Sequence, residues 1–206
     1  MDIKTGIPIY NAVINDDECG IDRISLVDSP AVESYFVAFN KAKQPILFSS
    51  NEPQKMITGV IARCDFPIYR YDKELGEYYI NFTQETIKQM AQKLLRDNNQ
   101  NNVNIEHLFG SDVDGVEMVE LFFKDIDKGK NPTGFEDISN GSLFATFKVD
   151  NQDIWQKIRS GEFKGFSLEG MFGFDLPSNE PENIVDEDVE LDELLAMLDE
   201  LYRRTH

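Results

Sequence analysis

Positive charge is scarce in this chain of 206 residues. Twenty lysines and arginines stand against 38 aspartates and glutamates, which gives a formal net charge of −18. Half of this excess lies in residues 175–206, which hold eleven acidic residues and two arginines. A protein that binds nucleic acid needs clustered Lys and Arg side chains to neutralise phosphates. The composition therefore argues against a nucleic-acid-binding protein and favours basic or amphipathic partners.

Long apolar runs and a disulfide framework are also missing. No run approaches the ~20 apolar residues that a helix needs to cross a bilayer. Residues 1–6 lack the basic and then apolar pattern of a signal peptide. Cys19 and Cys64 are the only cysteines, and their surroundings differ, which favours two reduced thiols. Cys64 is a conceivable nucleophile, but its apolar setting favours an inert core residue. We expect a soluble intracellular protein without membrane association.

Only one histidine lies inside the chain. His107 ends the apolar alternation over residues 103–107, whereas His206 is the final residue. Sixty residues after His107, Ser167 lies in the segment 165–170, which glycines bracket. A serine hydroxyl becomes a good nucleophile when a base accepts its proton, and histidine titrates in the useful range. If this protein performs serine-type hydrolysis, His107 is the candidate base and Ser167 the leading nucleophile.

Short β-strands account for most of the predicted secondary structure. Apolar or alternating runs predict strands at residues 7–14, 23–27, 57–62, 77–82, 103–107, 116–123, 143–149 and 165–174. A helix is predicted after Thr83, which can cap it, from apolar residues at helical spacing: Ile87, Met90, Ala91, Leu94 and Leu95. A second, short helix around Trp155 should end at Gly161. The body is therefore mostly β with two helices.

The ends of the chain differ from this body in pattern. Residues 1–52 form a strand-rich lead segment that finishes in a Pro- and Ser-containing connector from residue 41. Residues 53–175 form the denser body, and residues 176–206 form an acidic tail. In the tail, residues 189–201 place leucines on one helical face. Because so short a helix is marginal alone in water, we expect it to dock on a partner surface.

Several segments resemble one family of viral enzymes. These segments are 67–70, 79–82, 103–107 and 161–170, whose last part is Gly-Phe-Ser-Leu-Glu-Gly. Residues from about 56 to 174 resemble the phage prohead (capsid maturation) proteases of the herpesvirus-assemblin-like group. Residues 20–31 are similar to the lead segment of the XkdF-like serine protease branch. The resemblance implies an α+β fold, with a mostly antiparallel, β-barrel-like body and two or three flanking helices.

The resemblance also implies a catalytic triad. His107 matches the base and Ser167 the nucleophile, in the order of the family. The third member has to be an acid, because no second internal histidine exists. Glu120 is slightly preferred, on the strand after His107; Asp72 lies in a turn; Glu169 shares the strand face of Ser167. The sequence leaves the choice among these three acids open.

The resemblance implies a function as well. We expect a serine endopeptidase of phage head maturation that cleaves scaffold and major capsid precursors inside the assembling procapsid, in the host cytoplasm. No cofactor or metal is implied, and a homo-oligomer is possible. The alternative is a non-catalytic virion or scaffold-associated assembly protein that retains the protease fold.

Overall fold

The computed structural model describes residues 4, 6–31, 37–38 and 54–175. In this part of the chain, eleven strands and two helices follow one another. Their bounds are β1 (Ile9–Val13), β2 (Gly20–Val27), β3 (Val37–Ala38), β4 (Met56–Ala62), β5 (Ile68–Asp72), β6 (Gly76–Asn81), α1 (Gln84–Arg96), β7 (Val103–Ile105), β8 (Val116–Phe123), β9 (Leu143–Val149), α2 (Gln152–Ser160), β10 (Gly165–Met171) and β11 (Gly173–Asp175). The predicted tail helix over residues 189–201 lies outside the described residues. No described helix is long and apolar enough to cross a membrane.

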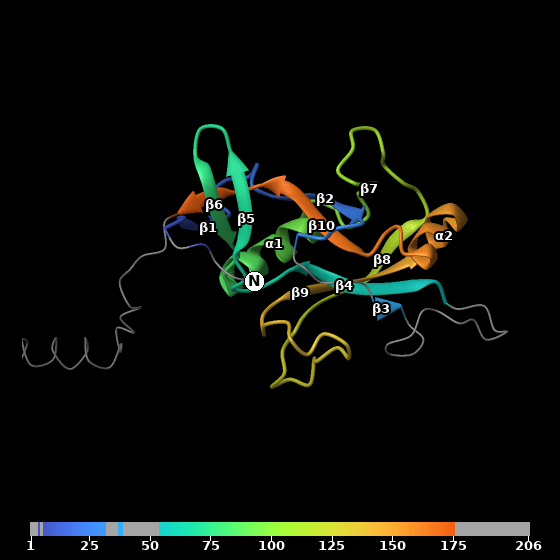
Figure 1. Cartoon of the computed structure of the whole chain (residues 1–206). Helices are drawn as coiled ribbons and strands as arrows, with labels where there is room; N and C mark the ends of the chain where they lie inside the picture. The colour runs from blue at the N-terminus through green and yellow to red at the C-terminus, as the bar shows by residue number, and fades with distance from the viewer. Residues whose placement is uncertain (1–3, 5, 32–36, 39–53, 176–206) are drawn as a thin grey trace, which may run out of the picture. The chain divides into compact units, whose positions relative to one another are not determined.

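The strands form three open sheets, so the predicted barrel-like body is wrong. The strand orders are β11-β1-β6-β5, β10-β2-β7 and β3-β4-β9-β8. A barrel closes only when the first and last strands of one sheet pair with each other, and each of these sheets ends in two edges. Figure 1 shows β10 running beside β2 and passing into β11, which pairs with β1 in another sheet. The pairs β1–β6 and β2–β7 are also parallel.

Both predicted helices are confirmed, together with Thr83 as the cap of the first and Gly161 as the end of the second. Thr83 caps α1, since its hydroxyl accepts the backbone N–H of Thr86 at 3.2 Å. Asn151 caps α2, and Gly161 ends it with φ of 77° in the left-handed region, where glycine meets no Cβ penalty. The apolar face of α1 is buried except at Leu95, which is 50% exposed. The 3.6-residue period therefore predicted the face correctly and overestimated its width by one position.

One apolar core joins all three sheets and both helices. It includes Leu26 on β2, Met90 on α1 and Phe147 on β9, each fully buried. Phe166 on β10 packs its ring against Phe147 at a centroid distance of 4.9 Å. Burial of such a side chain stabilises the fold by roughly 1.5–3 kcal/mol. Because neighbouring residues on a strand point to opposite faces, this packing turns Ser167 away from the core.

A buried lysine secures the long loop after β8. Lys124 is 1% exposed, and its ammonium group donates hydrogen bonds to the carbonyl oxygens of Phe135 at 2.8 Å and Ile138 at 2.7 Å. A third, longer bond of 3.4 Å goes to the carbonyl of Glu136. Buried charges need such partners. The loop is thereby held against the sheet of β8 and β9.

Candidate functional site

A row of polar side chains crosses one face of the sheet β10-β2-β7. Ser167 on β10 pairs with Ser25 on β2, and Ser25 pairs with Asn104 on β7. Residues paired across strands project from the same face, with Cβ atoms roughly 4.5–5.5 Å apart. All three are buried: Ser25 is 0% exposed, Asn104 3% and Ser167 8%. The pairing therefore places three polar groups side by side where a strand pattern normally presents apolar ones.

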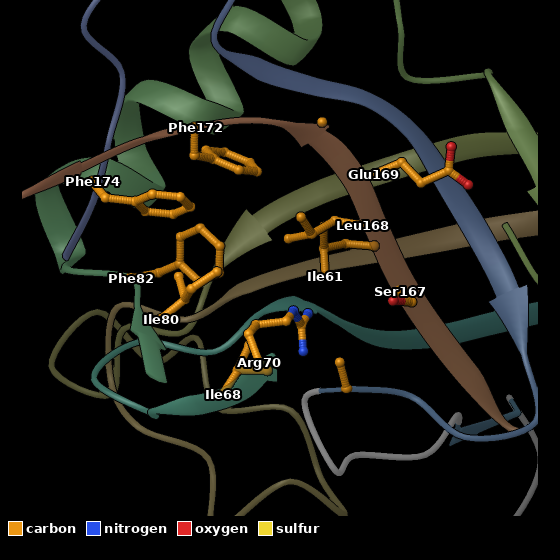
Figure 2. Close-up of a pocket in the computed structure, with 12 residues that line it drawn as sticks. Ile61, Ile68, Arg70, Ile80, Phe82, Ser167, Leu168, Glu169, Phe172 and Phe174 are labelled. Atoms are coloured by element: carbon orange, nitrogen blue, oxygen red, sulfur yellow. The ribbon is translucent and has the colours of Figure 1, made fainter. Parts of the chain in front are cut away.

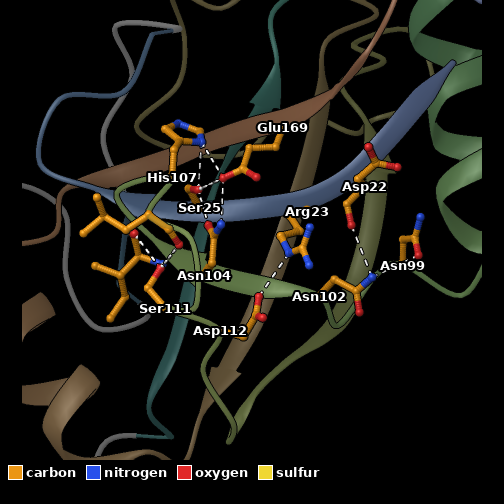
Figure 3. A network of polar contacts seen from close by, with 12 residues as sticks. Asp22, Arg23, Ser25, Asn99, Asn102, Asn104, His107, Ser111, Asp112 and Glu169 are labelled. Carbon is orange, nitrogen blue, oxygen red and sulfur yellow. Dashed lines mark hydrogen bonds and ion pairs between the residues drawn. The ribbon is translucent and has the colours of Figure 1, made fainter. Parts of the chain in front are cut away.

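A left-handed turn brings the imidazole of His107 over this row. Strand β7 ends at Ile105, so the prediction that the strand runs to His107 is wrong by two residues. Glu106 and His107 have φ angles of 51° and 57°, and the Glu106 N–H donates to the Leu26 carbonyl at 3.1 Å. The chain thus folds back toward β2, and His107 Nδ1 lies 3.0 Å from the Ser25 hydroxyl (Figure 3). Non-glycine residues adopt this conformation rarely, and such residues concentrate at functional sites.

The loop that carries His107 is fixed on its far side as well. Ser111 accepts the Ile105 N–H at 3.1 Å, and its own hydroxyl donates to the carbonyl of Leu108 at 2.6 Å. Arg23 on β2 forms an ion pair of 3.0 Å with Asp112 (Figure 3). The exposed ion pair contributes little by itself. Together these contacts close residues 105–112 into a loop of defined shape.

Glu169 is the acid that contacts His107. Its Oε1 atom lies 2.7 Å from His107 Nδ1, and it accepts hydrogen bonds from the Asn104 amide at 2.7 Å and the Ser25 hydroxyl at 3.0 Å. Ser25 also donates to the Asn104 amide oxygen, so its single proton is shared between two acceptors. An ionised carboxylate cannot donate a hydrogen bond. The proton between Glu169 Oε1 and His107 Nδ1 is therefore bonded to Nδ1. The Nε2 atom is then left with the lone pair that a general base requires.

The surroundings of Glu169 keep it ionised at neutral pH. Partial burial raises the pKa of its carboxyl group, because removal from water disfavours charge. Hydrogen bonds from Asn104, His107 and Ser25 act in the opposite direction and prevail, so the pKa lies below its usual range. A carboxylate that is ionised at neutral pH and contacts Nδ1 fixes the orientation and tautomer of the imidazole.

The structure does not bring the other two candidate acids to His107. Glu120 lies on β8, in a different sheet, and accepts a hydrogen bond of 3.0 Å from the Thr146 hydroxyl. Asp72 ends β5 and accepts the backbone N–H groups of Glu74 at 2.7 Å and Leu75 at 3.1 Å, which lower its pKa. Asp72 therefore shapes the turn between β5 and β6.

Ser167 borders a cavity of about 320 Å³. Figure 2 shows the residues that line it: Ala31, Ile61, Ile68, Arg70, Ile80, Phe82, Ser167, Leu168, Glu169, Gly170, Phe172 and Phe174. Among the described residues, none forms a hydrogen bond with the Ser167 hydroxyl, and Ser25 is the serine that contacts His107. However, Ser25 shares the Nδ1 side of the ring with Glu169 and is fully enclosed. Ser167 is the serine of this row that a substrate in the cavity would meet.

Two residues of the site were missed at the sequence level. Ser25 lies between Ile24 and Leu26, and Asn104 between Val103 and Ile105, so each is a polar residue in an apolar strand. A buried polar side chain costs free energy unless it finds a partner. A polar residue within an apolar strand was therefore a signal that could have identified both residues. Nothing in the sequence indicated that the two side chains would contact each other.

Cys64, considered above as an alternative nucleophile, does not contact His107. It is 1% exposed, and burial, reinforced by the nearby Asp65 carboxylate, raises the pKa of its thiol to about 12. A thiol with that pKa is protonated at neutral pH, and the thiolate is the nucleophilic form. No group of three His, Cys, Asp or Glu side chains that could hold a metal ion occurs in the described part of the chain.

A β-bulge follows Glu169 and depends on Gly170. The register shifts from the pair Glu169–Arg23 to the pair Gly170–Ile21, which leaves Asp22 as the extra residue on β2. Bulges aim neighbouring side chains and are frequent beside active sites. A β-carbon at Gly170 would lie 1.8 Å from the Gly20 carbonyl oxygen, which no side-chain movement can relieve.

We therefore expect Gly170→Ala to destabilise the fold by more than ~3 kcal/mol, as the backbone of β2 has to move. Gly129→Ala is the matched control, since that position has φ of 73° and open space around it. Its cost is only the ~1–2 kcal/mol of a left-handed alanine. Urea denaturation of both variants measures the difference, and equal losses would show that the close approach at Gly170 is unimportant.

Comparison with known proteins finds one matching family and one similar protein. Residues 43–173 match the family model described as "Putative phage serine protease XkdF". The chain is 27% identical over 158 residues to the uncharacterized protein YqbD of Bacillus subtilis strain 168. That alignment covers 73% of this chain and 44% of YqbD, so the chain spans less than half the length of this relative. No solved structure matches the chain.

Proposed function

Because the chain belongs to the phage serine protease family XkdF, we propose that it is an endopeptidase that cleaves scaffold and major capsid precursors during phage head maturation. The observation that carries the proposal is the contact of 2.7 Å between Glu169 and His107 on the sheet face that also bears Ser167. This contact supplies the acid-to-imidazole half of a serine protease triad. We place the action inside the procapsid, in the host cytoplasm.

The proposed chemistry assigns one role to each group. Ser167 attacks the scissile carbonyl carbon as its hydroxyl proton passes to Nε2 of His107. The imidazolium then returns that proton to the leaving amine, and water hydrolyses the acyl-enzyme by the same route. Glu169 holds the proton on Nδ1 and stabilises the imidazolium. Hydrogen bonds between nucleophile and base are often loose before substrate binds. We interpret in this way the lack of a hydrogen bond between the Ser167 hydroxyl and any described residue.

Ser25 and Asn104 act in this proposal as positioning residues. Each donates a hydrogen bond to the carboxylate oxygen of Glu169 that faces His107. Neither borders the cavity beside Ser167. Their role is to fix the Glu169 side chain, which would otherwise lose its orientation through free rotation.

A second candidate function is that of a non-catalytic assembly protein with this fold. The Ser167 hydroxyl forms no hydrogen bond with the residues that the structure describes, and this favours the assembly role, because an active triad needs Ser167 and His107 in contact. In that case the polar row would serve stability alone, and the protein would bind scaffold or capsid subunits without cutting them.

Co-expression with the scaffold and major capsid precursors of the same phage distinguishes the two functions. Intact-mass analysis of the precursors should show trimming with the native chain and with Ser160→Ala, an exposed serine on α2. Trimming should disappear with Ser167→Ala and with His107→Ala. Trimming that survives Ser167→Ala contradicts the mechanism, and intact precursors with the folded native chain favour the assembly protein.

A further inference from the structure

The turn after β7 holds two consecutive apolar side chains outside the core. Phe109 is fully exposed, and Leu108 is 60% exposed. Phe109 is the most exposed of the large hydrophobic residues in the described part of the chain. Single exposed apolar residues are common on soluble proteins, whereas adjacent ones that form a patch are typical of interaction sites. The pair is therefore a candidate contact with another molecule.

Backbone hydrogen bonds fix this pair at the tip of a tight turn. The Ser111 N–H donates to the Leu108 carbonyl at 3.2 Å, and Gly110 has a φ angle of 76°. A bond from the fourth residue to the first, with a left-handed third residue, is the pattern of a type II turn. Phe109 is the second residue of this turn, and its side chain projects from the loop rather than into the apolar core. Because the turn is already formed, binding at Phe109 costs little conformational entropy of the backbone.

The turn lies immediately beside the proposed catalytic base. Phe109 follows His107 by two residues, so their Cα atoms are at most ~7 Å apart. The Leu108 N–H donates to the Ile105 carbonyl at 3.0 Å, which ties the turn to the end of β7. In Figure 1 the loop after β7 projects beyond β2 and β10. A protein held at Phe109 therefore has its neighbouring segments within reach of the site.

The charge around the turn indicates the kind of partner. Between Arg96 and Lys124 the sequence has no lysine or arginine. The same stretch contains six acids, namely Asp97, Glu106, Asp112, Asp114, Glu117 and Glu120. Asp112 is neutralised by Arg23, whereas the exposed carboxylate of Asp114 forms no ion pair with any described residue. A second copy of this chain, with its net charge of −18, would be repelled, and so would the acidic tail. A protein with lysines or arginines around an apolar pocket would be attracted.

We propose that Leu108 and Phe109 form a docking site for the precursor that the protease cleaves, at a surface of that precursor away from its cleavage site. The partner surface is an apolar pocket bordered by lysine or arginine side chains, and the Phe109 ring enters this pocket. Buried aromatic side chains supply much of the binding energy of protein interfaces. The inference rests on the proposed function, because it takes Ser167 and His107 as the place of cleavage.

Cleavage of a whole precursor and of a short peptide that spans the same cleavage site separates docking from catalysis. Phe109→Ser should lower the ratio of kcat/KM for the precursor to kcat/KM for the peptide by at least ~10-fold, since the peptide lacks the docking surface. Phe109→Leu should retain most of the ratio, because it keeps an apolar side chain at the tip. Ile126→Ser is the matched control, since Ile126 is 53% exposed in the loop after β8, and it should leave the ratio unchanged. A ratio that Phe109→Ser does not change overturns the proposal.

A binding measurement keeps the docking site testable if no proteolysis is found. The scaffold precursor and the major capsid precursor are each titrated into the full chain that carries Ser167→Ala, with isothermal titration calorimetry as the readout. At least one precursor should bind, and Phe109→Ser should raise its Kd by at least ~10-fold. Binding should also weaken as the NaCl concentration rises, because salt screens the acidic residues from a basic partner. Precursor binding through Phe109 without any cleavage by the native chain would mean that the protease assignment fails and the docking site stands.

Three results of the titrations overturn the docking site. They are the absence of binding by both precursors, binding that Phe109→Ser leaves unchanged, and an affinity that does not fall with added salt. Sedimentation velocity of the native chain tests the other occupant, a second copy. A dimer that Phe109→Ser dissociates would assign the turn to self-association and overturn its role in docking the precursor.

Discussion

Ser167→Ala should lower peptide cleavage by at least ~10⁴-fold and leave the fold intact, because removal of the nucleophile of a serine protease has an effect of this size or larger. The Ser167 hydroxyl has no hydrogen-bond partner among the described residues. The loss of the oxygen atom therefore leaves no buried group without a partner. The increase in fluorescence of an internally quenched peptide gives the cleavage rate, and thermal denaturation gives the stability of the fold.

Ser25→Ala is the control that the row itself provides. This change removes a fully buried hydroxyl that contacts Asn104, His107 and Glu169. It should cost about 1–3 kcal/mol of stability, since buried acceptors lose their donor, and reduce cleavage much less than Ser167→Ala. If the two variants exchange these results, Ser25 is the nucleophile and the cavity plays no part in catalysis.

Glu169→Gln should have the second-largest effect, a loss of cleavage of about 10⁴-fold. An amide can donate to Nδ1, and the imidazole then carries its proton on Nε2, where it cannot accept one from serine. Glu120→Gln and Asp72→Asn are the matched controls, because each neutralises an acid that does not contact His107. Both should retain nearly full cleavage. A large loss with Glu120→Gln and little with Glu169→Gln would transfer the role of the acid to Glu120.

The same substitution should show a defined pH dependence of stability. The pKa of Glu169 is lower in the folded chain than its ordinary value of 4.5. Its ionised form therefore stabilises the fold at pH values above the unfolded pKa, and this contribution is lost as the pH falls through the folded pKa. The native chain should exceed Glu169→Gln in free energy of unfolding at neutral pH, and the difference should vanish in strong acid. Urea denaturation across that pH range measures it, and a constant difference would contradict the assigned ionisation.

Local structure was predictable because its signals are local. Thr83 and Gly161 marked the helix limits where the chain places them, and strand periodicity located Ser167 and Glu169 on one face. Sheet order was not predictable, since β2 pairs with a strand about 140 residues later and with another about 80 residues later. Hydrophobic periodicity predicts which face of a strand is buried, but it does not predict which other strand pairs with it. The barrel-like body came from the resemblance alone, and the three open sheets correct it.

The geometry of the site shows the same limit. The prediction that β7 extends to His107 was wrong. The left-handed φ angles of Glu106 and His107 end the strand, and the hydrophobic pattern of the sequence does not indicate them. That turn brings the imidazole back to Glu169, one of the three acids among which the sequence left the choice open. Ser25 and Asn104 entered the site through contacts across 144 and 65 residues, respectively, to Glu169. Contacts of this range depend on the fold as a whole.

Covalent labelling with a fluorophosphonate tests the central claim most directly, since this reagent phosphonylates a serine that a base has activated. The native chain is treated with the reagent, digested and sequenced by tandem mass spectrometry, beside His107→Ala as the control. The account predicts one adduct, on Ser167, that forms with the native chain and not with His107→Ala. An adduct on Ser25, or labelling of Ser167 that is independent of His107, would contradict it.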